Sequence, residues 1–356
     1  MRLLLVFAIL AACKTARPSP PRSELDELAT RFAAAMSPCN PTTIDTLVDS
    51  DALITRMIAG RNFTSSQIDR LRRSARGHIG AIVCARLPSD SFTYLRTQTI
   101  DRTPRPLFRM LTRGLNYVEL ELATTGGAVR IVDFYNVGDG ENLSQLLGDA
   151  ASRVVAGGET PSTVAVRVRQ RVSERQGAEA RVLLATLPAD VRRTKTMMLM
   201  AIKIAELLDD EPAYLAAVDA YAKQYPGDPS LELVQLDHSI LRKDPHAFTL
   251  IDRLDKRLGG DPYQDIMRAA AAREAGNHAA AVTYAKRATE REPGLEVAWW
   301  ALAAAHAGAG NINAALATFG HLRAQFRATF GGLRDDARFI ALTATAEYAA
   351  WAAEHL

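Results

Sequence analysis

The sequence predicts an α+β N-terminal domain followed by an all-α solenoid of helical repeats. Polar and apolar residues alternate, as they do in β-strands, only between residues 92 and 137. The apolar residues before and after that stretch follow helical spacing, and from residue 213 onward small residues recur every 34 positions. Hydrophobic residues make up 48% of the 356, which is enough for two cores. We therefore place an α+β domain at 22–156 and a repeat domain at 160–356.

The first residues have the pattern of a secretory signal. Met1 and Arg2 precede an apolar run that ends in Leu10-Ala11-Ala12-Cys13. The end of this run resembles the bacterial lipobox, in which two small residues precede a cysteine that is acylated before cleavage. The resemblance predicts a lipoprotein signal peptide at 1–12 and a membrane anchor at Cys13, followed by a proline-rich tether at 13–21. The alternative is an ordinary cleaved signal in which Cys13 occurs by chance.

A lipid on Cys13 places the protein in the bacterial cell envelope. Lys14 replaces the Asp that is often linked to inner-membrane retention, so we expect the periplasmic face of the outer membrane. Disulfides persist in that compartment. The other two cysteines, Cys39 and Cys84, would close a loop of about 45 residues if they were bridged. We expect this disulfide, and two separate buried thiols are the alternative.

Helices are predicted before the strands. Ser23 and the acidic residues after it begin a helix that ends at Ser37-Pro38. A second helical stretch covers residues 44–58, and a capping box at residues 64–67 begins a third helix that continues to about Cys84.

Alternation then predicts strands at 92–100, 107–111, 116–122 and 129–137. Gly126 and Gly127 favour a hairpin turn before the last strand, and another helix begins near Leu143. This order of helices and strands resembles the NTF2-like (cystatin-like) superfamily, in which a helical layer closes over a curved antiparallel sheet. The resemblance implies that fold and allows for a pocket inside the sheet. It implies no reaction, because the superfamily includes enzymes, binding modules and inert scaffolds.

Catalytic chemistry has little support in the sequence. Asp133 and His78 are conceivable as an acid–base pair, but Asp133 is better interpreted as a partner of a neighbouring backbone group or Arg, and His78 as a residue on a polar helix face. The histidines are scattered and none has the spacing of a metal ligand. We therefore predict that the protein is not an enzyme, and we assign no catalytic residue, no metal site and no cofactor.

The strongest pattern is the 34-residue period. It relates four alanines, Ala213, Ala247, Ala281 and Ala315, and two glycines, Gly276 and Gly310. This period and the packing residues around Trp299 and Phe319 resemble the tetratricopeptide (TPR) family. The resemblance implies antiparallel helical pairs with a turn glycine inside each pair. In the outer repeats Arg242 and Leu208 occupy the expected turn position, residues 160–195 are a candidate for a further pair, and one final helix that contains Phe339 and Trp351 would cap the stack.

TPR stacks bind peptides or protein surfaces on the concave face, which is lined by the first helix of each pair. In this register Tyr263, Arg273 and Trp300 lie on that face, and we identify them as candidate partner-binding residues. The alternative is that these aromatic residues pack the core. We expect Trp299, at the position between paired helices, to be a packing residue.

Charge argues against nucleic acid as a partner. The net charge is +3, and residues 22–156 and 157–356 carry +1 and −1, without the excess of basic residues that binding to phosphates requires. The sequence thus favours a membrane-anchored, non-enzymatic scaffold that binds a protein or peptide partner on the concave face of its solenoid. The alternative is an envelope enzyme or small-ligand binder that uses a pocket in the NTF2-like domain.

Overall fold

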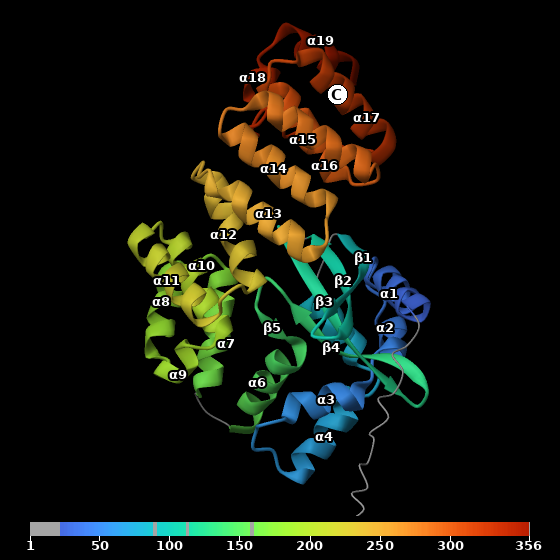
Figure 1. The fold of residues 1–356 in the computed structure, drawn as a ribbon, viewed down its shortest axis with the longest axis vertical. Helices are drawn as coiled ribbons and strands as arrows, with labels where there is room; N and C mark the ends of the chain where they lie inside the picture. Colours follow the sequence, from blue (N-terminus) through green and yellow to red (C-terminus); the bar gives the residue numbers. More distant parts are fainter. Residues whose placement is uncertain (1–21, 88–90, 112–113, 157–159, 356) are drawn as a thin grey trace, which may run out of the picture.

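A five-stranded antiparallel sheet packs between N-terminal helices and a stack of C-terminal helical pairs (Figure 1). This computed structural model describes residues 22–87, 91–111, 114–156 and 160–355. The predicted signal peptide, Cys13 and the tether therefore lie outside the described residues. The fold class is the one that the sequence predicts, an α+β region followed by an all-helical repeat region.

Five helices precede the sheet, where the sequence predicts three. They are α1 (Arg22–Met36), α2 (Pro41–Leu47), α3 (Ser50–Ile58), α4 (Ser65–Ala75) and α5 (Ile79–Arg86). The stretch predicted as one helix at 44–58 is interrupted because Val48 bridges to Ile131 of the sheet and Asp49 caps α3. The third predicted helix is interrupted at Gly77, which has a left-handed φ of 69°.

The strands follow one another in a meander, so each strand pairs with its neighbour in the sequence. They are β1 (Ser91–Ile100), β2 (Thr103–Leu111), β3 (Leu115–Thr125), β4 (Ala128–Asn136) and the short β5 (Glu141–Asn142), and α6 (Leu143–Ala156) follows. The predicted turn between β3 and β4 is confirmed, because Gly126 and Gly127 both have positive φ.

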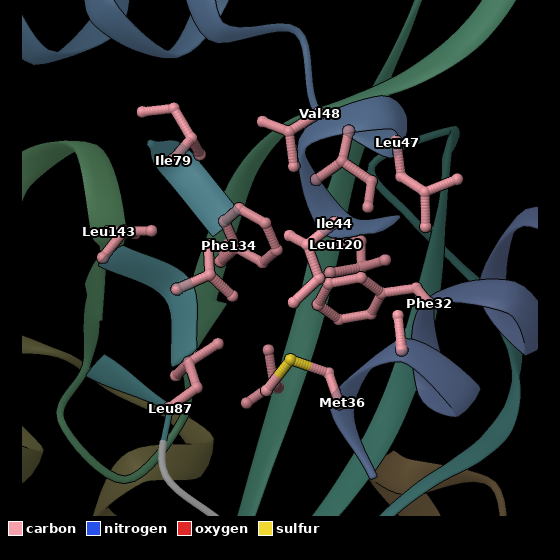
Figure 2. Packing of buried hydrophobic residues seen from close by; sticks show 14 of the residues in the cluster. Phe32, Met36, Ile44, Leu47, Val48, Ile79, Leu87, Leu120, Phe134 and Leu143 are labelled. Carbon is pink, nitrogen blue, oxygen red and sulfur yellow. The ribbon is translucent and has the colours of Figure 1, made fainter. Parts of the chain in front are cut away.

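One face of the sheet and the N-terminal helices enclose an apolar core (Figure 2). Phe32 of α1 is fully buried, and its ring lies 5.6 Å from Phe108 and 5.5 Å from Phe134, measured between centroids. Side chains such as Leu120 and Ile44 pack around these rings. Apolar groups thus fill the interior that the alternative hypothesis would need as a ligand pocket.

The predicted disulfide between Cys39 and Cys84 is confirmed. It joins the turn after α1 to α5, and the two Cα atoms are 5.8 Å apart. The bridge therefore links the segment at the end of α1 covalently to α5 within the helical layer.

The described part of the repeat region contains five antiparallel helical pairs. The first and second helices of each pair are α7 (Pro161–Ser173) and α8 (Gly177–Thr186), α10 (Lys195–Leu207) and α11 (Glu211–Gln224), α12 (Pro229–Leu241) and α13 (His246–Leu258), α14 (Pro262–Glu274) and α15 (His278–Arg291), and α16 (Glu296–Gly308) and α17 (Ile312–Phe326). The single turn of α9 (Ala189–Arg192) joins the first two pairs, and residues 160–195 do supply the further pair.

The turns inside the pairs correct the predicted register. Gly276 and Gly310 are left-handed as expected, with φ of 76° and 71°. In the outer repeats, however, the left-handed residues are Asp209 and Lys243, each one position after the predicted Leu208 and Arg242. In the third pair, three residues separate the left-handed Lys243 from the buried Ala247. In the fourth pair, four residues separate Gly276 from the buried Ala281.

The same offset changes the role of one of the four alanines. Ala247, Ala281 and Ala315 are buried on the inner side of their second helices, as the period predicts. Ala213 is exposed, and its neighbour Tyr214 is buried in the equivalent place, with 4% of its surface accessible. The match of Ala213 to the period is therefore accidental.

The end of the chain caps the last pair with two short helices, α18 (Ile340–Thr343) and α19 (Ala346–His355), where the sequence predicts one. Phe330, Phe339 and Tyr348 are buried against Phe319 of α17. The segment between α17 and α18 therefore folds back over the first-helix side of the last pair.

The other face of the sheet packs on the repeat region (Figure 1). Leu107 and Tyr117 are fully buried in a cluster with Leu236 of α12 and with Leu250 and Leu254 of α13. The sheet thus has a core on each side, and the two predicted domains share an extensive interface.

Candidate functional site

A groove of about 490 Å³ lies between α14, α16 and the segment 329–338. Tyr263, Arg273 and Trp300 all line it, so the structure brings together the three residues that the sequence identifies. Tyr263 lies near the start of α14 and Arg273 near its end, and Trp300 lies on the adjacent first helix. The groove is therefore on the predicted concave face.

Small residues give the groove its depth. Its helical walls are built largely from alanines, and the cap adds two apolar side chains; these residues are Ala269, Ala270, Ala301, Ala304, Ala305, Phe330 and Leu333. Because alanine side chains end at Cβ, the two helices leave room between them for an inserted side chain. The sequence predicts a capping helix but gives no sign that the cap lines the groove.

Trp300 has two environments. One part of its indole lines the groove, and the ring lies 5.6 Å from Phe330 and 5.9 Å from Phe319 between centroids. Its Nε1 donates to Glu296 Oε1 at 3.0 Å. Trp299 instead stacks on His321 of α17 and donates to the Pro293 carbonyl, as expected of a residue between paired helices. Both tryptophans thus contribute to packing, and Trp300 also faces the groove.

Charged groups gather at one end of the groove. The Arg273 guanidinium is 2.7 Å from Glu274 on its own helix, and Arg338 is 2.6 Å from Asp336. The hydrogen bond from Arg338 lowers the pKa of Asp336, and the positive charge of Arg273 adds to this shift. The lining thus contains two guanidiniums and one carboxylate, which favours an acidic or carbonyl group of a ligand.

Tyr263 forms the boundary between the groove and the sheet. Its ring lies 5.9 Å from the Arg109 guanidinium carbon, and burial raises the pKa of its hydroxyl to about 12. Beyond it, α12 and the start of α10 contact the outer face of the sheet through Leu233, Leu236 and Lys195. The concave surface is therefore not open along the whole stack, and the groove spans α14 and α16.

A buried polar network behind Tyr263 joins the sheet to the repeats. Arg109 of β2 is fully buried and donates to Asp261, the N-cap of α14, at 2.6 Å and to Glu292 at 2.5 and 2.9 Å. Tyr117 donates to Asp261 at 2.8 Å and accepts from Gln264 at 2.7 Å. Burial alone would lower the pKa of Arg109, but the hydrogen bonds and charges of Glu292 and Asp261 raise it overall. This network fixes the start of α14.

The residues considered for catalysis do not come together. Asp133 is buried and accepts from the backbone N–H groups of Phe134 and Ser144 and from the Ser144 hydroxyl, with Arg56 at 3.8 Å. His78 is the exposed N-cap residue of α5, and its Nδ1 lies 2.9 Å from the Arg76 carbonyl oxygen. The interpretation of Asp133 as a partner of backbone and Arg groups is therefore confirmed.

Comparison with known families gives one match. The model of the bacterial transcriptional activator domain (BTAD) matches residues 250–342, which include the helices and the cap of the groove. The match supports TPR-like helical repeats in this region and covers about a quarter of the chain. No similar curated protein and no similar solved structure was found.

Proposed function

We propose that the protein is a non-enzymatic scaffold that binds a peptide segment of a protein partner in the groove between α14 and α16. The observation that carries this proposal is the convergence of Tyr263, Arg273 and Trp300 on one groove with small-residue walls. An apolar side chain of the partner would insert between the alanines, next to the indole. An acidic or carbonyl group beside it would accept from Arg273 or Arg338.

We further propose that a lipid on Cys13 holds this scaffold in the bacterial envelope, at the periplasmic face of the outer membrane. The proposal rests on the lipobox-like sequence, and the disulfide is consistent with an oxidising compartment. Within the described ranges, none of the helices has the length and apolar character needed to cross a membrane. In this proposal the lipid is the anchor, and the tether at 13–21 links it to α1.

Anchoring is tested by replacing the acylated residue. Cys13→Ala removes the thiol, so the variant should move from the detergent phase to the aqueous phase on phase partitioning. A variant that partitions like the wild type contradicts the lipid anchor and leaves the groove proposal unaffected.

Partner binding is tested by site-specific photo-crosslinking in the native envelope. A photoreactive residue at Val297, which lines the groove and is 36% exposed, should yield a discrete adduct. The same residue at Leu215 on α11, 57% exposed and away from the groove, is the matched control. Arg273→Glu should abolish the Val297 adduct. An adduct at both positions, or one that survives Arg273→Glu, would refute the groove as the binding site.

Two other functions have less support. A ligand pocket inside the N-terminal sheet lacks space, because Phe32, Phe108 and Phe134 fill that interior. The name of the matched domain refers to transcriptional activators, but the match lies on the helical repeats that form the groove. With a net charge of +3 over 356 residues, a protein partner remains our proposal, in preference to nucleic acid.

A further inference from the structure

A second cleft, of about 680 Å³, lies between the sheet region and the first two repeats. Its lining from the N-terminal part includes Arg105 of β2, Glu141 and Asn142 of β5. The repeat region contributes Arg169 of α7 and Lys195 of α10. This cleft is separate from the groove, and its size is typical of small-molecule sites.

Three buried polar atoms on the lining side chains have no hydrogen-bond partner. They are Nε of Arg105, Nη2 of Arg169 and Oδ1 of Asn142. Other atoms of both guanidiniums form ion pairs: Arg105 is 3.3 Å from Glu121 and 3.5 Å from Glu119, and Nη1 of Arg169 is bonded to Glu141. These ion pairs hold both arginines in place, while Arg105 Nε and Arg169 Nη2 are left without an acceptor, and an unsatisfied buried group is costly.

The charged and aromatic side chains of the cleft restrict which ligand groups could form hydrogen bonds with these three atoms. Four cationic side chains, Arg61, Arg105, Arg169 and Lys195, line it together with three carboxylates, Glu121, Glu141 and Asp149. Glu119 and Asp228, outside the lining, pair with Arg105 and Lys195. Burial raises the pKa of Glu141 to about 7, which reduces the negative charge further near neutral pH. Lys195 lies over the rings of Tyr135 and Tyr225 and pairs with Asp228, so it is fixed in position.

We propose that this cleft binds a small polar molecule that carries a carboxylate and at least one hydroxyl group, as sugar acids and hydroxy acids do. The carboxylate accepts from Arg105 Nε and Arg169 Nη2, and the hydroxyl donates to Asn142 Oδ1. Because the walls come from both parts of the chain, the ligand bridges β5 to α7 and strengthens their contact. This site is independent of the peptide groove.

The test is isothermal titration calorimetry of the full chain in detergent with D-glucuronate, D-gluconate and L-malate. At least one of these acids should bind. D-glucose, which has hydroxyl groups but no carboxylate, and sulfate, which has negative charge but no hydroxyl group, should bind at least tenfold more weakly. Arg169→Gln should raise the Kd at least tenfold. Arg181→Gln, at an exposed arginine on α8, and Arg273→Gln, in the groove, should leave the Kd unchanged.

Asn142→Ala provides a second variant if Arg169→Gln does not fold, since it removes only the acceptor, and it should also raise the Kd. The proposal is overturned if none of the three acids binds, which would mean that water satisfies the cleft. It is equally overturned if sulfate or glucose binds as well as the acids, or if the Kd is unchanged in every folded cleft variant.

Discussion

Trp300 and Arg273 line the same groove, but we expect Trp300 to contribute to the stability of the fold and Arg273 to contribute mainly to partner binding. The indole of Trp300 contacts the aromatic cluster of the cap, so Trp300→Ala removes core packing together with a wall of the groove. We expect it to lower the free energy of unfolding by about 3 kcal/mol, as burial of a large aromatic side chain suggests. Chemical denaturation measures this loss, and Trp299→Ala should lose a similar amount.

Arg273→Gln should separate binding from stability. Arg273 makes its ion pair with Glu274 on the same helix, and such pairs contribute about 0.5 kcal/mol or less. The variant should therefore unfold like the wild type and yet lose the partner in crosslinking at Val297. An early unfolding transition in Arg273→Gln would show that the residue supports the fold instead.

Glu141 should make stability depend on pH. Burial raises its pKa from 4.5 to about 7, although Arg169 opposes this shift and Asp139 adds to it. The folded protein therefore binds more protons than the unfolded chain between pH 4.5 and 7. Its free energy of unfolding should fall as the pH rises through that window and level off above it. In urea denaturation at pH 5 and pH 8, Glu141→Gln should reduce this difference; an unchanged difference would contradict the assignment.

For the helices and strands, the sequence was sufficient to predict the structure wherever a local pattern determines it. The strands follow alternation, and the helices of the repeats follow the 34-residue period, because both patterns record which side chains are buried. The one-residue offset at Lys243 was not predictable, since a lysine in a left-handed turn carries no sequence signal. The helix break at Val48 depends on its bridge to the sheet, and the break at Gly77 depends on the left-handed backbone of that glycine.

The turns give a matched pair of substitutions. Lys243 has a φ of 58°, which is strained for a residue with a side chain, and Gly276 has a φ of 76°. Lys243→Gly should therefore stabilise the fold by about 1 kcal/mol, and Gly276→Ala, which meets no atom within 4 Å, should destabilise it by a similar amount. Thermal unfolding of both variants checks the corrected register. Equal destabilisation by both changes would contradict it.

The disulfide acts on the helical layer. It closes a loop of 45 residues, and a bridge of that span stabilises a fold by about 2–4 kcal/mol. A Cys39→Ser/Cys84→Ser double variant should lose this amount in denaturation experiments. A reducing agent should lower the stability of the wild type toward that of the variant and should not affect the variant itself.

At the scale of the whole molecule, the interface between sheet and repeats is what the sequence did not reveal. Arg109 and Asp261 are 152 residues apart, and each occurs singly, without a repeating pattern. The groove residues were predictable because they share a helical face, but the cap residues Phe330 and Arg338 were not, since a loop's path depends on tertiary contacts. The closure of the concave surface by the sheet follows from the same long-range packing.

Arg109→Met tests whether this interface makes the two parts unfold together. The change leaves the carboxylates of Asp261 and Glu292 next to the sheet without their cation, and breaking a buried pair in this way costs about 3–5 kcal/mol. Asp261 also caps α14 and accepts from Tyr117, so the start of the groove should loosen with it.

The wild type should unfold in one transition, and Arg109→Met in two, with the repeat region and the sheet region melting separately in calorimetry. Arg338→Met removes an exposed arginine that pairs with Asp336 and lies over the ring of Phe339; it serves as the control and should keep one transition. If Arg109→Met also melts in a single transition at the wild-type temperature, the buried network does not join the two parts, and the apolar contacts of Leu107 and Tyr117 are sufficient.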